Sequence, residues 1–122
     1  MRYEDDPRFR GYYLEDSFVM AITACVPEIR IELELHLTRE HPEWREPRAN
    51  EWACYRKGVL RFIDVSVADY RPSGLPPILD PDGSSDLGTI DHLGFLPDGR
   101  YELEGDWGTL SVTARDAHIA LC

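Results

Sequence analysis

Hydrophobic and polar residues alternate most regularly between residues 28 and 38, in the stretch EIRIELELHLT. The apolar positions of this stretch are Ile29, Ile31, Leu33, Leu35 and Leu37. Because successive side chains of a strand point to opposite faces, this spacing predicts a half-buried antiparallel strand. The preceding stretch, DSFVMAITACV, alternates less cleanly and fits either a strand or a short helix capped by Asp16. We expect two strands joined by a hairpin around Val26-Pro27-Glu28.

The stretch NEWACYRKGVLRFIDVSVAD, residues 50–69, predicts a second hairpin. Lys57-Gly58 would supply its turn, because glycine accepts the positive φ that such turns require. In the second strand Leu60 and Phe62 lie on one face, and the apolar positions then change to Ile63, Val65 and Val67. This change of parity predicts a bulge, or burial on both faces.

The C-terminal third predicts a meander of short strands. The segments are GTIDHLGFL, the turn Pro97-Asp98-Gly99, RYELEG, the turn Asp106-Trp107-Gly108, TLSVTA and AHIALC. Short strands separated by turn residues are typical of sandwiches and barrels. We therefore expect an all-β fold: an antiparallel β-sandwich or strongly curved sheet of about seven or eight strands. One short helix near residues 15–25 or 75–80 is compatible with the pattern.

The chain of 122 residues is expected to form a single domain, 1–122. Residues 1–13 look like an irregular N-terminal segment. Residues 69–88 look like a long loop, because they contain four prolines and three glycines. Such long loops are usually functional, disordered, or a sign of an unrecognised element. Within it, three aliphatic side chains could hold the loop against the core: Leu75, Ile78 and Leu79.

The acidic stretch DPDGSSDLGTID raises the question of a metal site. Its four carboxylates, and thus the candidate metal ligands, are Asp80, Asp82, Asp86 and Asp91. Calcium binds closely spaced carboxylates, but an EF-hand requires glycine at the sixth position, where this stretch has Ser85. The glycine comes two positions early, at Gly83, and Pro81-Asp82-Gly83 is fully explained as a β-turn. A turn is therefore the preferred interpretation and a metal site the alternative.

No other motif indicates catalysis. The sequence lacks a GxSxG elbow, a GxGxxG stretch, a phosphate-binding loop and an HxxxH pair. Cys25 and Cys54 are interpreted as buried thiols and Cys122 as an exposed one, since no CxxC pair exists. We therefore predict that the protein is not an enzyme and has no cofactor.

Aromatic and charged side chains in the loops are candidates for partner contacts, because Trp, Tyr and Arg are enriched in binding hot spots. The predicted contact residues are Trp44, Arg45, Arg48, Tyr70, Asp80, Asp82 and Asp86. Trp52 and Trp107 are expected instead to plug the ends of the β structure.

The net charge of −10 affects which partners are plausible. Such a charge repels phosphate backbones, so we expect no nucleic-acid binding. It favours a basic protein partner. No apolar run approaches the length of a membrane helix, and the N-terminus lacks the basic and apolar regions of a signal peptide. We therefore expect no membrane association and a cytoplasmic location.

Four segments together carry a resemblance: LEDSFVMAIT, LTREHPEWREPRANEWACYRKGVLRF, DLGTIDHL and GRYELEGDWGTLSV. They resemble a group of small uncharacterised bacterial proteins, over about Leu14 to Val112. That group implies a domain of unknown function and brings no catalytic residues with it. In size, acidity and strand pattern the chain is also loosely similar to the β-rich immunity proteins of bacterial toxin systems.

Three functional hypotheses follow. The first is an acidic protein-binding module, of the kind that an immunity protein represents, which binds a basic partner. The second is a homodimeric structural protein that associates through a sheet edge or face. The third is a metal-dependent enzyme that uses the aspartates of residues 80–91.

Overall fold

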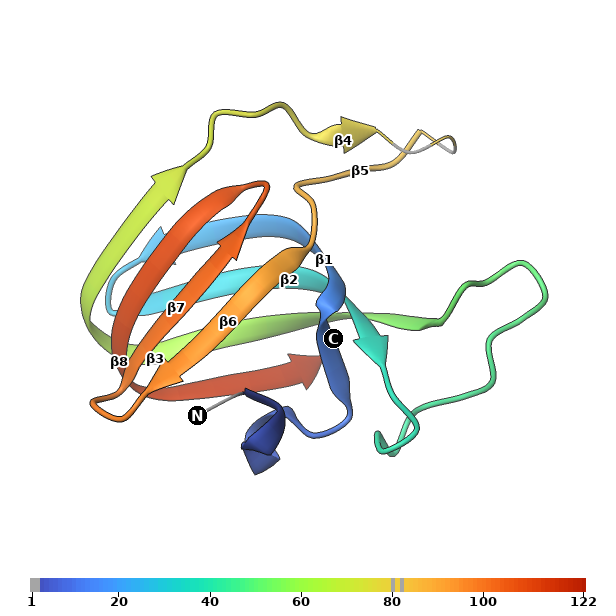
Figure 1. Ribbon diagram of the computed structural model, residues 1–122, viewed down its shortest axis with the longest axis horizontal. Helices are drawn as coiled ribbons and strands as arrows, with labels where there is room; N and C mark the ends of the chain where they lie inside the picture. Colours follow the sequence, from blue (N-terminus) through green and yellow to red (C-terminus); the bar gives the residue numbers. More distant parts are fainter. Residues whose placement is uncertain (1–2, 80, 82) are drawn as a thin grey trace.

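The computed structural model describes residues 3–79, 81 and 83–122, which form eight β-strands and two short 3-10 helices (Figure 1). The strands are β1 (Tyr12–Cys25), β2 (Glu28–Leu37), β3 (Cys54–Pro72), β4 (Ile78–Leu79), β5 (Ser85–Asp86), β6 (Ile90–Leu96), β7 (Arg100–Gly105) and β8 (Gly108–Leu121). Six of them form one antiparallel sheet in the order β1-β2-β3-β8-β7-β6, and β4 pairs with β5. The expectation of an all-β fold built on a strongly curved antiparallel sheet is confirmed.

The predicted N-terminal hairpin is also confirmed. β1 and β2 pair in antiparallel register and are joined at Val26-Pro27. The five alternating apolar side chains of β2 are all buried. The two suggested helix positions were wrong, because residues 15–25 lie in β1 and β4 occupies residues 78–79.

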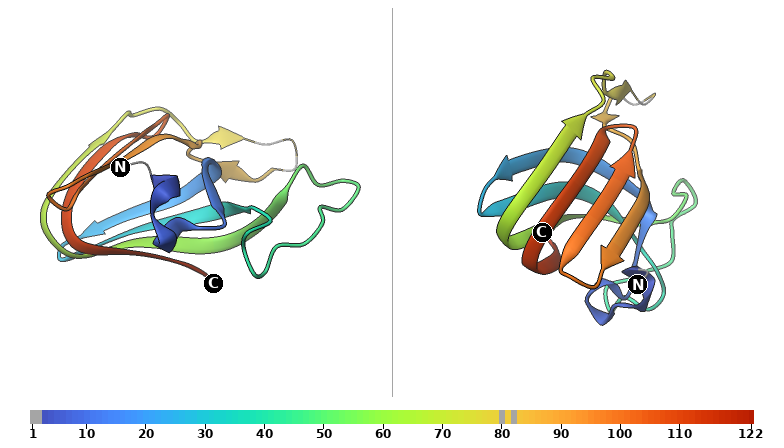
Figure 2. Two further views of the ribbon diagram at one scale, coloured as in Figure 1. Left: turned by 60° about the horizontal axis from the view of Figure 1, so that its bottom comes forward. Right: turned by 60° about the vertical axis from the view of Figure 1, so that its left-hand side comes forward.

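The sheet bends sharply where its two longest strands change the spacing of their buried residues. In β3 the buried side chains of Phe62 and Val65 are three residues apart, and in β8 the same holds for Ala114 and Ala117. The two changes lie side by side, because Val65 pairs with Ala114. A register shift follows between Val65 and Val67, as the parity change in the sequence predicts. Both strands therefore curl around the core together (Figures 1 and 2).

An ion pair lies on the outside of this bend. Asp64 has a φ of 54°, a conformation uncommon for residues other than glycine. The Nε of Arg115 donates to its carboxylate at 2.5 Å. Val67, which shares the apolar spacing of Ile63 and Val65 in the sequence, is exposed just beyond the bend because the inserted residue of the bulge changes which side chains face inward.

Bending brings the two outer strands of the sheet, β1 and β6, back together. The amide of Val19 donates to the carbonyl of Gly88, and the amide of Leu87 donates to the carbonyl of Val19, both at 2.8 Å. Phe18 and Thr89 form an isolated bridge. The result is a barrel-like shell that is closed by backbone hydrogen bonds at one point rather than by a full strand pair.

Side chains from all six strands of the sheet fill this shell, and each fully buried Leu or Ile contributes roughly 1.5–3 kcal/mol. The N-terminal segment takes part as well. It forms two 3-10 helices, Tyr3–Asp5 and Pro7–Phe9, with Tyr3 and Phe9 buried. The Phe9 ring lies 5.0 Å from that of Phe95, so the segment expected to be irregular covers one end of the core.

The prediction of a turn at Lys57-Gly58 was wrong, because both residues lie inside β3. The glycine has a packing role there. A Cβ at Gly58 would lie 2.4 Å from Cδ1 of Leu35 and 2.6 Å from the carbonyl oxygen of Ala120. Neighbouring strands therefore approach more closely at this position than a side chain would allow.

We expect Gly58→Ala to lower the free energy of unfolding by about 1–3 kcal/mol, the usual cost of overpacking. Gly94→Ala is a matched control, because its Cβ would meet only the tip of the His92 side chain, at 3.1 Å. Urea denaturation of the two variants measures both effects. Equal midpoints for Gly58→Ala and the wild type would show that the close approach is not needed.

Candidate functional site

A pocket lies where the segment that carries β4 and β5 leaves the barrel. We call residues 73–79, 81 and 83–87 the arm. Figure 1 shows the arm running over one end of the shell. The pocket has a volume of about 390 Å³ and is lined by Tyr70, Pro72, Ser73, Gly74, Leu75, Pro76, Ile78, Leu87, Asp106 and Trp107. Its lining is mostly apolar, with a carboxylate at Asp106.

The floor of the pocket is rigid. Trp107 is buried, and its indole Nε1 donates to the carbonyl of Thr89 at 3.2 Å. The ring of the half-buried Tyr70 lies 6.3 Å from the Trp107 ring. Gly108 follows with a φ of 130°, and a Cβ there would lie 2.1 Å from the carbonyl oxygen of Arg71. Glycine is thus required at this position for β3 to pass over the β7–β8 turn.

The arm is attached at both of its ends. At its start, the amide of Ser73 donates to the carbonyl of Trp107 at 2.9 Å, and the Ser73 hydroxyl donates to the carbonyl of Asp106 at 2.6 Å. At its end, the Leu87 backbone is bonded to Val19, and Leu87 packs against the core. Between these points β4 pairs with β5. The pocket therefore has a fixed floor and an anchored roof.

The aliphatic side chains of the arm do not hold it to the core, contrary to the expectation from the sequence. Leu75 is 65% exposed and Leu79 is 77% exposed, and Ile78 is exposed as well. Leu87 makes the anchoring contact instead, because its backbone is fixed beside Val19. The arm therefore presents apolar side chains to the solvent at the edge of an apolar pocket.

The acidic residues of the candidate metal site fall into three groups. Asp80 and Asp82 lie outside the described residues. Asp86 is buried, and its Oδ1 accepts a hydrogen bond from the amide of Gly88 at 2.7 Å, so it stabilises the turn into β6. Asp91 is exposed and accepts a hydrogen bond from the Thr89 hydroxyl. Within the described part of the chain there is no group of three His, Cys, Asp or Glu residues that could hold a metal ion.

Among the predicted contact residues, Tyr70 lies in the pocket wall, but Asp86 is turned inward and is not available to a partner. Trp44, Arg45 and Arg48 lie in a second loop, residues 38–53. Figure 1 shows this loop apart from the arm. The sequence therefore predicted one residue of the pocket and missed its apolar lining.

The 38–53 loop is organised around Glu51. Its carboxylate accepts two hydrogen bonds from Arg45, at 2.9 and 3.1 Å, and one from the amide of Arg48, at 3.0 Å. The Arg45 guanidinium, followed by the Arg48 amide, lowers the pKa of Glu51 to about 2. Trp44 is half-buried against the core, whereas Trp52, expected to be a plug, is 87% exposed. Trp107 is the tryptophan that closes an end of the shell.

A polar cluster lies on the outer face of β1, β2 and β3. An irregularity of β1 between Tyr13 and Phe18 turns the Asp16 side chain outward over the neighbouring strands. The Asp16 Oδ2 lies 2.8 Å from His36 Nδ1 and accepts a hydrogen bond from the Tyr55 hydroxyl at 2.7 Å. Burial, with the Asp16 carboxylate, raises the pKa of Tyr55. The cluster fixes the imidazole beside a carboxylate, as in general-base sites, but none of the pockets described for the shell includes it.

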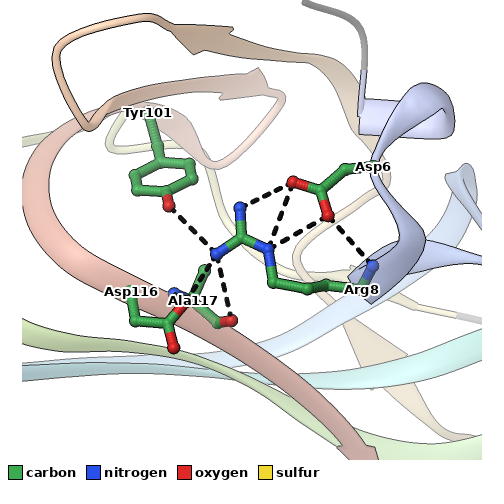
Figure 3. Close-up of polar contacts among 5 residues, drawn as sticks. All are labelled: Asp6, Arg8, Tyr101, Asp116 and Ala117. Atoms are coloured by element: carbon green, nitrogen blue, oxygen red, sulfur yellow. Dashed lines mark hydrogen bonds and ion pairs between the residues drawn. The ribbon is translucent and has the colours of Figure 1, made fainter.

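Arg8 fastens the N-terminal segment to the barrel (Figure 3). Its guanidinium donates to Asp6 through Nε and Nη2, and its Nη1 donates to Asp116 at 2.6 Å and to the Tyr101 hydroxyl at 3.4 Å. The hydrogen bonds that Arg8 donates to the Asp6 carboxylate are the main reason why the pKa of Arg8 is raised. With carboxylates on both sides, Arg8 acts as a structural clamp between the 3-10 helices and β8 rather than as an anion receptor.

The cysteines are placed differently from the expectation in one case. Cys54 is buried and Cys122 is exposed, as predicted, but Cys25 is exposed at the end of β1. Burial of Cys25 was expected because a free cysteine behaves as a small hydrophobic residue. The hairpin, however, extends past the core at this end, so the last side chains of β1 face the solvent.

Comparisons of the chain with protein-family models, curated proteins and solved structures return no match. The resemblance to small bacterial proteins and to immunity proteins therefore stays a prediction. The described residues contain no helix with the length and apolar character needed to cross a membrane.

The Arg8 clamp predicts a pH dependence of stability. Hydrogen bonds from Arg8 hold the pKa of Asp6 below its ordinary value of 3.8, and the Ala117 amide followed by Arg8 lowers that of Asp116. A carboxylate with a lowered pKa in the folded state stabilises the protein above its unfolded-state pKa, and this contribution is lost as the pH falls through the folded-state value. We expect Asp6→Asn to cost about 1–3 kcal/mol at pH 7 and to flatten the loss of stability below about pH 4.

Urea denaturation at pH 7 and at pH 3 measures this effect. Asp98→Asn is the matched control, because the Asp98 side chain is largely exposed and lies 4.0 Å from Arg100. It should behave like the wild type at both pH values. An Asp6→Asn variant with the same pH dependence as the wild type would show that the clamp does not contribute to acid sensitivity.

Proposed function

We propose that this chain is a small protein-binding module whose pocket beneath the arm receives an apolar side chain of a basic partner. The observation that carries the proposal is the combination of a rigid aromatic floor, an anchored apolar roof and exposed aliphatic side chains around the same pocket. Exposed apolar groups at a preformed hollow are characteristic of interaction sites, because burying them on binding removes apolar surface from water.

The charge of the protein supports a basic partner. The carboxylate of Asp106 borders the pocket, in a chain whose net charge is −10. A positively charged residue next to the inserted apolar side chain would lie near Asp106. The overall field would accelerate the encounter with a basic protein. A basic toxin neutralised by an immunity protein is one partner of this kind.

The proposal predicts which variants lose binding. We expect Leu75→Ser to weaken the complex about five- to thirtyfold, because the roof loses an apolar contact of roughly 1–2 kcal/mol. Asp106→Asn should weaken it less and reduce its dependence on salt. Val67→Ser is the control, because Val67 is an exposed aliphatic residue of β3 that does not line the pocket.

The measurement is capture of partners from a lysate of the native host by the tagged protein and its three variants, at low and at high salt. The captured protein is then purified, and its affinity for each variant is measured. A basic protein that salt releases, and that Leu75→Ser binds poorly, supports the proposal. A partner that all variants bind equally, or the absence of any captured protein, contradicts it.

A further inference from the structure

Several strand segments leave one side of their backbone without a strand partner in the described part of the chain, among them β6 beyond Ile90 and β8 beyond Thr113. Two of these segments lie next to the tip of the β1–β2 hairpin. The first is Ala21–Cys25 of β1, which pairs with β2 on one side and lies beyond the contact of Val19 with Gly88 on the other. The second is Ser66–Pro72 of β3, which pairs with β8 and has passed the end of β2. Open edges of this kind are templates for pairing with another strand.

The two edges differ in their protection. The edge of β3 carries Asp69, Arg71 and Pro72, which are the residue types that prevent unwanted strand pairing. The edge of β1 has no such protection, because residues 17–27 contain no Asp, Glu, Lys, Arg or His. In a chain with 30% charged residues, this uncharged stretch coincides with an open strand edge.

The β1 edge is also held ready for pairing. Regular pairing with β2 runs from Ala21 opposite Glu32 to Cys25 opposite Glu28, so the segment is fixed in an extended conformation. The tip of the hairpin lies at the outer margin of the molecule in the right-hand view of Figure 2. Thr23, Ala24 and Cys25 are exposed, and Val26 is 62% exposed. Little further ordering would therefore be needed when a second strand adds to this edge.

We propose that the occupant of this edge is the same edge of a second copy of the chain, paired antiparallel about a two-fold axis. Antiparallel edges are self-complementary, and a two-fold contact closes after two molecules. The charge distribution favours this occupant over a basic protein, because the uncharged edge offers a basic partner no electrostatic gain. It is also a place where two molecules of net charge −10 can touch without placing acidic residues directly against each other.

The expected dimer is weak and has a distinctive dependence on salt. An edge of about five residues buries less than the roughly 1,000 Å² of a stable interface, so we expect dissociation in the micromolar range or weaker. Salt screens the repulsion between the two acidic molecules, so higher salt strengthens the dimer. A basic partner at the pocket beneath the arm would be released by the same salt, which separates this inference from the proposed function.

The test is the molar mass in light scattering over a series of protein concentrations, at low and at high salt. Thr23→Glu places a charge on the edge and should abolish the dimer. Thr113→Glu adds the same charge at a position of β8 that is paired on both sides, with Arg100 and with Val67, and should leave the dimer intact. Matching urea midpoints confirm that both variants are folded.

Hydrogen exchange locates the contact. The amides of residues 21–25 should become more protected as the concentration of the wild type rises, and those of Thr23→Glu should not. The inference is overturned by a monomer at every concentration, by a dimer that Thr23→Glu leaves unchanged, by protection confined to another segment, or by masses that grow beyond the dimer.

Discussion

The bend shared by β3 and β8 is the constraint on which the rest of the structure depends. Both strands change the spacing of their buried residues where Val65 pairs with Ala114. One continuous sheet can therefore fold back and enclose the core between its two halves. Without this bend, the apolar faces of β1 and β2 would have no opposite wall. The outer strands β1 and β6 would then not meet, and the hydrogen bonds between Val19 and Gly88 would not form.

The bend also explains where the free edges and the pocket lie. β3 is so long that its second half passes the end of β2, which leaves one side of it open. The arm starts from this half and returns across the end of the shell to Leu87. The pocket is the space between the returning arm and the Trp107 floor. Its position is thus a consequence of strand length and bending rather than of any local motif.

The two proposed surfaces differ in charge. The pocket combines apolar groups with a carboxylate, so it suits a partner that carries positive charge. The β1 edge is apolar and uncharged, so it suits an identical edge. In the Arg8 clamp and the Glu51 cluster, the arginines and carboxylates pair with one another. These carboxylates are therefore already engaged in hydrogen bonds within the protein.

The sequence by itself determined the all-β class, the β1–β2 hairpin, the C-terminal meander and the presence of a bulge in β3, because these depend on local alternation and turn residues. It did not reveal that Gly58 serves close packing, that Trp52 is exposed or that Arg8 joins two carboxylates. Those properties depend on residues far apart in the chain, such as Asp6 and Asp116. Only the tertiary structure decided which edges stay open and where the pocket forms, because both follow from how the sheet bends as a whole.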